Sequence, residues 1–438
     1  MALLKTILFA LVMGMTTYPC VFAENQALYR PSEIIVRFAD DASAEARSAV
    51  LRRNDCQVTG YCRRSLMHRV DISPQQEAMD VLTRLNETPA VDYAELNYLT
   101  WAFFVPNDVL YPIQWNLHAS DRGGINAEPG WDIHTGDPKV RVAVLDTGVA
   151  YEDFDGFFLA PDLSGTRFVP GYDYINNDAH PNDDHGHGTH VAGTIAQSTN
   201  NGLGVAGIAF GCSIMPVKIL DHKGIGDQFT LARGIHFAVD NGAQVINLSL
   251  GSEGGSQTLL NALVRAKRAG TMVVCAAGNE FLDGNPVTYP AAYDDYCLSV
   301  GATAYDLERA RYSSTGTYVD VVAPGGEVST DLNHDGFVDG ILQQTFRKEV
   351  DDFSYWFFQG TSMAAPHVSG AVALVMSSGI TDLDRVREAI EQTAVDLGPV
   401  GWDVEFGWGL LDLGAAMTYW PSSLQGRNSG DIVLSSNG

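Results

Sequence analysis

Short apolar runs alternate with segments of helical spacing from residue 140 onward, and this alternation limits the fold more than any other feature of the chain. Continuous apolar runs are typical of strands buried on both faces, and intervening helices allow successive strands to lie parallel. The pattern predicts an α/β fold, a three-layer domain with a mainly parallel central sheet. Strands are expected at residues 140–145, 214–220, 244–250, 272–276, 298–301 and 318–322, with helices such as 229–241 and 258–269 between them.

A second, smaller α+β unit is predicted at residues 29–98, where strand and helix patterns are mixed. A unit of about 70 residues forms only a marginal core by itself. Residues 101–112, apolar but interrupted by prolines, are expected to link it to the larger domain. Within the small unit, strands are expected at residues 33–38, 66–72 and 91–98, and helices at 42–53 and 75–86.

The two ends of the chain have the composition of segments outside the folded units. Lys5 precedes an apolar run that is too short to span a bilayer, and small residues follow at 21–23, so residues 1–23 are predicted to be a signal peptide cleaved before Glu24. The mature protein is then expected to be secreted, into the medium or the periplasm, with no membrane segment. The Ser-, Gly- and Asn-rich tail 421–438 is expected to be disordered.

The formal net charge of −26 argues against nucleic-acid binding, because no basic stripe is present to neutralise phosphates. Most of the acidity follows residue 105, where it indicates a solvated surface or cation binding. Cysteine pairing is left open. A Cys56–Cys62 bridge and a Cys275–Cys297 bridge are both conceivable, and with Cys212 the number after the signal peptide is odd, so one thiol must remain.

Three motifs carry an aspartate, a histidine and a serine in that order along the chain. Asp146-Thr-Gly ends an apolar strand, His187 lies in His-Gly-His-Gly-Thr-His, and Ser362 lies in Gly-Thr-Ser-Met-Ala-Ala-Pro-His. A serine hydroxyl is a weak nucleophile that needs an imidazole base, itself oriented by a carboxylate. Since active sites of parallel sheets gather at the carboxyl ends of strands, the three side chains are expected to meet there.

These motifs resemble those of the subtilisin-like serine proteases, the subtilases, over about residues 110–418. The resemblance implies that Asp146 orients the base, His187 acts as base and then acid, and Ser362 attacks the scissile carbonyl. It also implies that Asn279, with the backbone N–H of Ser362, stabilises the oxyanion. His190 and His367 are expected to be buried and hydrogen-bonded, and Asp183-Asp184 to lie in a solvated loop.

The same resemblance implies the residues that bind substrate. The implied pocket is apolar, with Thr288 at a polar floor and Glu280 near the rim. Such a pocket suggests broad specificity with some preference for apolar side chains. The implied pocket walls are Ser249, Leu250 and Gly251 on one side and Ala276, Ala277 and Gly278 on the other, and Gly224, Ile225 and Gly226 form the edge that pairs with the substrate backbone.

Calcium is the cofactor that the resemblance implies, at a loop starting at Thr199. A second loop, Asp331 to Asp339, has oxygen side chains at positions 1, 3, 5 and 9 with Gly336 at position 6, which indicates either another calcium site or an Asx-rich turn. The implied ligands of the first site are Thr199, Asn201, Leu203, Val205, Asp162 and Gln114, and those of the second are Asp331, Asn333, Asp335 and Asp339.

Residues 24–105 resemble the subtilase propeptide, an intramolecular inhibitor and folding chaperone, with the cut expected between about residues 97 and 108. Residues 106–420 would then form the peptidase domain. The expected function is a secreted, monomeric serine endopeptidase of broad protein substrates, made as a self-processing zymogen. An inactive subtilase-fold scaffold is the main alternative. A calcium-stabilised adhesion protein should repeat the 331–339 loop, but the loop occurs only once. An esterase should place its serine in Gly-x-Ser-x-Gly, whereas Ser362 lies in Gly-Thr-Ser-Met-Ala.

Overall fold

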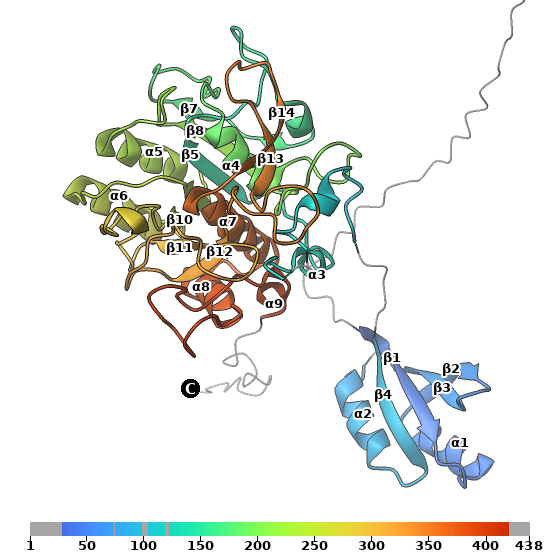
Figure 1. Ribbon diagram of the computed structural model, residues 1–438. Helices are drawn as coiled ribbons and strands as arrows, with labels where there is room; N and C mark the ends of the chain where they lie inside the picture. Colours follow the sequence, from blue (N-terminus) through green and yellow to red (C-terminus); the bar gives the residue numbers. More distant parts are fainter. Residues whose placement is uncertain (1–28, 74, 99–103, 119–121, 420–438) are drawn as a thin grey trace, which may run out of the picture. The chain divides into compact units, whose positions relative to one another are not determined.

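A computed structural model describes residues 29–73, 75–98, 104–118 and 122–419, which belong to two compact units, Met1–Ala102 and Phe103–Gly438 (Figure 1). The expected signal peptide and the polar tail lie outside the described residues. None of the helices in the described ranges is long and apolar enough to cross a membrane.

The small unit is a four-stranded antiparallel sheet with two helices, an α+β unit as the sequence predicts, with one strand more than expected. Alternate residues of its first strand, Ile34, Val36 and Phe38, are buried with Val81 and Leu85 of the second helix in one core. The strands are β1 (Tyr29–Phe38), β2 (Cys56–Cys62), β3 (Met67–Ile72) and β4 (Val91–Tyr98) in the order β2-β3-β1-β4, and the helices are α1 (Ala44–Arg53) and α2 (Ala78–Asn86).

Strand β2 was not predicted, and it decides one question about the cysteines. Cys56 and Cys62 are its two end residues, so their Cα atoms lie about 20 Å apart, whereas a disulfide needs less than about 7 Å. The Cys56–Cys62 alternative is therefore wrong. Cys275 and Cys297 are in hydrogen-bonding contact but unbridged, and all five described cysteines are free thiols.

The large unit contains a parallel sheet whose strand order is β12-β11-β10-β9-β5-β8-β6, with β7 also paired to β8. The six strands expected from the sequence all belong to it. Its strands are β5 (Arg141–Asp146), β6 (Arg167–Phe168), β7 (Tyr172–Asp173), β8 (Ser213–Lys218), β9 (Val245–Leu248), β10 (Met272–Ala276), β11 (Leu298–Thr303) and β12 (Val321–Pro324); β13 (Ile341–Thr345) and β14 (Ser354–Phe358) form a separate hairpin.

Helices cover both faces of this sheet, which gives the expected three layers (Figure 1). Strand β5 contributes Val142 and Val144 to one core and Ala143 and Leu145 to the other. Helices α4 (His187–Ala196) and α7 (Thr361–Ser377) border the first core, and α5 (Gln228–Asp240) and α6 (Gln257–Arg268) border the second; the remaining helical segments are α3 (Ala127–Trp131), α8 (Leu383–Gln392), α9 (Leu413–Thr418), η1 (Tyr111–Ile113), η2 (Pro161–Leu163) and η3 (Phe281–Asp283).

The expected linker is in part folded against the large unit. The ring of Phe104 contacts those of Trp131 and Phe210, and its backbone N–H donates to Asp132 at 2.8 Å. The chain from Phe104 onward is thus built into the larger domain, while residues 99–103 lie outside the described part.

Candidate active site

Three elements bring the predicted aspartate, histidine and serine to the carboxyl edge of the parallel sheet. Asp146 is the last residue of β5, His187 is the first of α4, and Ser362 is the second of α7 (Figure 1). A parallel sheet places strand ends and the beginnings of the following helices on the same edge. The order of elements alone therefore gathers residues that are far apart in sequence.

Asp146 and His187 form a direct pair. His187 Nδ1 lies 2.7 Å from Asp146 Oδ1, and the Asp146 side chain is fully buried. Burial disfavours the charged imidazolium, but the charge and hydrogen bond of Asp146, with a contribution from Asp183, outweigh this cost and raise the pKa of His187 above its usual value. The hydrogen bond on Nδ1 leaves Nε2 as the nitrogen that can exchange a proton with a third group.

Asp183, expected in a solvated loop, is instead 1% exposed and holds the pair in place. Its carboxylate accepts from the Thr147 hydroxyl at 2.8 Å, next to Asp146. It also accepts from the backbone N–H and the hydroxyl of Thr189, in the first turn of α4, at 2.9 and 2.6 Å. The backbone N–H groups of His185 and Gly186 complete five donors. One buried carboxylate thus ties the end of β5 to the start of α4.

Asp184 has a buried partner as well. Lys218, the last residue of β8, is fully buried and donates to Asp184 at 2.6 Å and to the carbonyl of Thr147 at 2.5 Å. The prediction of a solvated Asp183-Asp184 loop is therefore wrong. A buried charge needs partners. Asp184 is the partner of the buried Lys218, and Asp183 accepts from Thr147, next to Asp146.

Ser362 is held by Ser249 in a reciprocal pair of hydrogen bonds. The Ser362 hydroxyl donates to the carbonyl of Ser249 at 3.0 Å, and the Ser249 hydroxyl donates to the carbonyl of Ser362 at 2.8 Å. Asn247 donates to the Ser249 hydroxyl at 2.9 Å and accepts from Ser369 of α7 at 2.8 Å. For the Ser362 hydroxyl to donate to His187, it must rotate away from Ser249.

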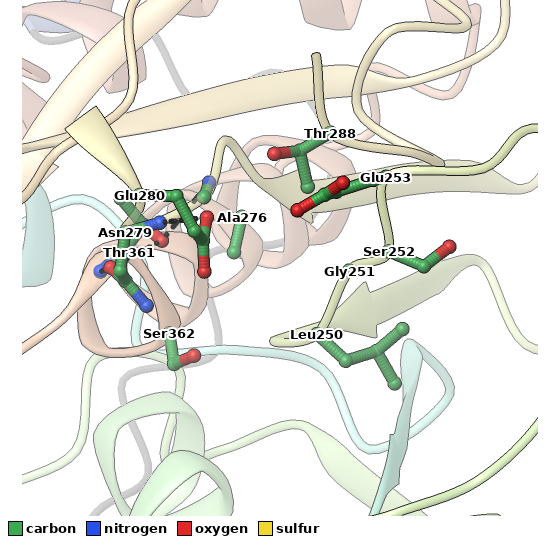
Figure 2. Close-up of a pocket in the computed structure, with 11 residues that line it drawn as sticks. Leu250, Gly251, Ser252, Glu253, Ala276, Asn279, Glu280, Thr288, Thr361 and Ser362 are labelled. Carbon is green, nitrogen blue, oxygen red and sulfur yellow. Dashed lines mark hydrogen bonds between the residues drawn. The ribbon is translucent and has the colours of Figure 1, made fainter. Parts of the chain in front are cut away.

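Asn279 follows β10 and is oriented by the same helix start. Its Oδ1 accepts from the backbone N–H and the hydroxyl of Thr361, at 2.9 and 3.0 Å. These bonds use the acceptor end of the amide, so the Nδ2 hydrogens can serve a third partner near Ser362. Figure 2 shows Asn279, Thr361 and Ser362 together at one side of a pocket.

This pocket, which we call the Ser362 pocket, has a volume of about 290 Å³. Four predicted wall residues line it: Leu250, Gly251, Ala276 and Gly278. Of the other two, Ala277 is fully buried and Ser249 is hydrogen-bonded to Ser362. The edge residue Ile225 is 63% exposed and is not among the lining residues. The pocket is lined by Leu250, Gly251, Ser252, Glu253, Ala276, Gly278, Asn279, Glu280, Thr288, Thr361 and Ser362.

The neighbouring histidines are structural, as predicted. His190 Nε2 lies 3.0 Å from the carbonyl of Ile341, and His367 Nδ1 lies 2.8 Å from the carbonyl of Met363. Burial lowers the pKa of His190 to about 3 and that of His367 to about 4, so both rings are neutral at neutral pH.

The structure brings residues of the predicted first calcium site together, with Asp108 in place of Gln114. Asp162 is fully buried, and its carboxylate accepts from Asn201 Nδ2 at 2.8 Å and from the backbone of Val205 at 3.1 Å. The additional carboxylate is Asp108, 3% exposed, which accepts from the backbone N–H of Asn200 at 2.7 Å. Gln114 instead exchanges hydrogen bonds with the backbone of Ala206.

Burial raises the pKa of Asp162 to about 6, and the charge of Asp108 adds to the shift. Two buried carboxylates with excess negative charge fit a cation, because a positive ion would offset the cost of burying them. Sequence reasoning missed Asp108 because it placed the residue in a linker. Its position beside the 199–205 loop is a tertiary contact across more than 90 residues.

The loop from Asp331 to Asp339 is held by its own hydrogen bonds. Asp335 accepts from the backbone of Phe337 at 2.8 Å and from the side chain of Asn333 at 2.9 Å, while Asp339 accepts from the backbone of Leu332 at 2.8 Å. These are the bonds of an Asx-rich turn. In the described part of the chain, no group of three or more His, Cys, Asp or Glu lies together as a metal site.

The profile of the subtilase family matches residues 137–409, and that of the fervidolysin N-terminal prodomain matches residues 20–97. The chain belongs to the subtilase family. It is a subtilisin-like serine endopeptidase that carries an N-terminal prodomain.

Individual subtilases are similar over most of the chain. A thermophilic serine proteinase of Bacillus sp. (strain AK1) is 35% identical over 91% of this chain and 90% of its own length. Thermitase of Thermoactinomyces vulgaris is 37% identical over 63% of this chain and 88% of its own. Among solved structures, a protease from Pseudoalteromonas arctica PAMC 21717 is 33% identical and matches 72% of this chain and 99% of that chain with a TM-score of 0.62.

Asp183→Asn is expected to destabilise the large unit, because an amide cannot accept from all five donors of the buried carboxylate. We expect the free energy of unfolding to fall by about 2–4 kcal/mol. Guanidinium-induced unfolding of the Ser362→Ala protein, with and without Asp183→Asn, measures the change. Asp352→Asn makes the same substitution at an exposed position and serves as control. Equal stability of the two asparagine variants would contradict the role given to Asp183.

Proposed function

We propose that this subtilase is a secreted endopeptidase that cleaves proteins through an acyl-enzyme on Ser362, and that it is made as a self-processing zymogen. The observation that carries the proposal is the 2.7 Å pair of His187 and Asp146 at the same edge of the sheet as Ser362 and the anchored Asn279.

In the first half-reaction, the Ser362 hydroxyl turns from Ser249 toward His187 Nε2 and attacks the scissile carbonyl carbon, while Nε2 takes its proton. Asp146 keeps the proton on Nδ1 and stabilises the imidazolium that forms. The carbonyl oxygen becomes an oxyanion, which accepts hydrogen bonds from Asn279 Nδ2 and the backbone N–H of Ser362. His187 then gives its proton to the leaving amine, the C–N bond breaks, and the acyl group stays on Ser362.

In the second half-reaction, a water molecule loses its proton to His187 Nε2 and attacks the ester. The tetrahedral intermediate uses the same two oxyanion donors, and its collapse returns the proton to Ser362. An extended substrate can add as a strand between the segments 224–226 and 249–251, which follow β8 and β9. Main-chain pairing of this kind suits substrates of many sequences, which supports protein substrates in general.

The prodomain is proposed to act as an intramolecular inhibitor and folding chaperone that the enzyme itself removes. Two contacts narrow the expected cut: Phe104 packs in the large unit and Asp108 binds the 199–205 loop. A cut after either residue would remove it from the mature protein. The interval from residue 97 to 104 is therefore the part of the expected range that preserves both contacts.

Calcium is the cation we propose at the 199–205 loop, held by Asp108, Asp162 and Asn201 with backbone carbonyls of the loop. Carboxylate, amide and carbonyl oxygens are the ligands that calcium prefers. Asn201 would have to present Oδ1 rather than its amide hydrogens. The ion would stabilise the fold and takes no part in peptide hydrolysis. At the Asp331 loop, a second calcium site stays a prediction from sequence alone, beside the Asx-rich turn that the hydrogen bonds of the loop form.

Self-processing is tested by intact-mass analysis of the purified wild type beside Ser362→Ala, both with calcium. We expect the wild type to lose about the first hundred residues and the variant to keep its prodomain, because removal requires the nucleophile. Circular dichroism shows whether both proteins are folded. Two folded, full-length proteins would contradict the zymogen mechanism and favour the inactive scaffold.

The pH profile of kcat/KM should have an acid limb above the usual histidine pKa of about 6.5. Only neutral His187 can accept the serine proton, and Asp146 favours the protonated form, so activity is lost as pH falls through the raised value. Asp146→Asn should move this limb to lower pH and reduce kcat by ~10⁴-fold. An unchanged limb in Asp146→Asn would show that another group titrates.

Calcium removal should lower the thermal stability of the Ser362→Ala protein. A single site saturated at about 100 times its Kd contributes ~2.7 kcal/mol. Asp108→Asn should abolish most of the difference between melting temperatures with calcium and with a chelator. Asp335→Asn tests the second loop in the same way. A calcium response that persists fully in Asp108→Asn would place the ion elsewhere.

A further inference from the structure

The Ser362 pocket contains two carboxylates, Glu253 and Glu280, and none of its lining residues is basic. The sequence predicted an apolar pocket with one acidic residue at the rim, and it did not place Glu253 there. Figure 2 shows Glu253 beside Thr288 at the end of the pocket away from Ser362, and Glu280 beside Asn279 and Thr361 on the side of Ser362. A side chain entering from the scissile bond would therefore have Glu280 near its entry and Glu253 near its far end.

The backbone on either side of Glu253 is fixed beside the pocket floor. Ser252 and Tyr289 exchange two backbone hydrogen bonds of 2.8 Å, which join the wall strand to the segment that carries Thr288. On the other side of Glu253, Gln228 donates to the carbonyl of Gly254. The carboxylate is thus attached to a segment that is tied to the floor at one side and to α5 at the other.

Glu280 is fixed by a hydrogen bond to the residue before it. Its Oε2 accepts from the backbone N–H of Asn279 at 2.7 Å. A Cβ atom at Gly278 would lie 2.9 Å from this oxygen and 2.5 Å from the hydroxyl oxygen of Thr288. The carboxylate therefore folds back over the glycine wall of the pocket toward the Thr288 hydroxyl, and it remains partly exposed to solvent.

The walls suit a long, unbranched stem. Glycines at 251 and 278 and the methyl of Ala276 leave a slot between the two strands, and a Cβ at Gly251 would meet Thr288 Cγ2 at 2.4 Å. Hydrocarbon can pack in this slot while a polar end reaches the carboxylates and the Thr288 hydroxyl. Lysine and arginine have this construction, an aliphatic stem with a cationic head.

We propose that Glu253 and Glu280 make this enzyme prefer substrates with lysine or arginine at the residue that donates the scissile carbonyl. The inference rests on the proposed function, since it names the substrate class of the same site. An acidic side chain would be repelled by both carboxylates. An apolar side chain would displace water from the carboxylates without replacing its hydrogen bonds, which costs free energy. Most of the acidity of the chain follows residue 105, so the peptidase domain also attracts cationic peptides over a longer range.

The size of the preference follows from the exposure of the two groups. Glu253 is exposed and Glu280 half-buried, so solvent and salt screen their charges. Charged hydrogen bonds nevertheless contribute enough to change kcat/KM by about ten-fold or more. The preference for a basic residue should therefore weaken as salt is added, whereas cleavage after an apolar residue should change little.

The test uses four peptides that differ only at this position, with lysine, arginine, phenylalanine or glutamate, and enzyme concentrations corrected by active-site titration with a fluorophosphonate. Wild type is expected to give a higher kcat/KM for lysine and arginine than for phenylalanine, and the lowest for glutamate. Glu253→Gln should lower the lysine-to-phenylalanine ratio by about ten-fold. Glu388→Gln, at an exposed position of α8, is the matched control and should leave the ratio unchanged.

Two other outcomes have separate meanings. If wild type is labelled and active but prefers phenylalanine, and Glu253→Gln leaves the ratio unaltered, the basic preference is wrong while the proposed hydrolysis stands. If wild type neither reacts with the fluorophosphonate nor cleaves any of the four peptides, the proposed function fails and this inference fails with it.

Discussion

The buried carboxylate of Asp183 is the interaction on which the site depends. Its five hydrogen bonds join the residue after β5 to the first turn of α4, and these two elements carry Asp146 and His187. A carboxylate in such a place is stable only while its donors are present, and the carboxylate in turn holds those donors in position. The position of the base and the stability of this part of the fold therefore have one cause.

The start of α7 holds the nucleophile and the oxyanion donor in position. Thr361 holds Oδ1 of Asn279, and Ser249 exchanges hydrogen bonds with Ser362, so the oxyanion donor and the nucleophile are both attached to the first turn of this helix. Oriented donors in a fixed frame need little reorganisation as charge develops on the substrate. The hydroxyl of Ser362 is the part that must move, by one rotation away from Ser249.

Negative charge has two separate uses in the large unit. At the 199–205 loop, Asp108 and Asp162 are buried together and their charge is suited to an ion. In the Ser362 pocket, Glu253 and Glu280 remain open to solvent and their charge is suited to the side chain of a substrate. Burial decides between these uses, because a buried pair requires a permanent counter-charge whereas an accessible pair can wait for a transient one.

The sequence by itself determined the two units, the six principal strands of the parallel sheet, and the motifs of Asp146, His187, Ser362 and Asn279, because periodicity and short motifs are local signals. Only the tertiary structure showed Asp183 as a buried support, Asp108 at the 199–205 loop, and Glu253 beside the pocket floor. It also excluded a Cys56–Cys62 bridge, since both residues lie on one strand. A charged residue looks the same in sequence whether it is solvated or buried. Its role depends on donors and cations supplied by segments far away in the chain, and only folding brings them together.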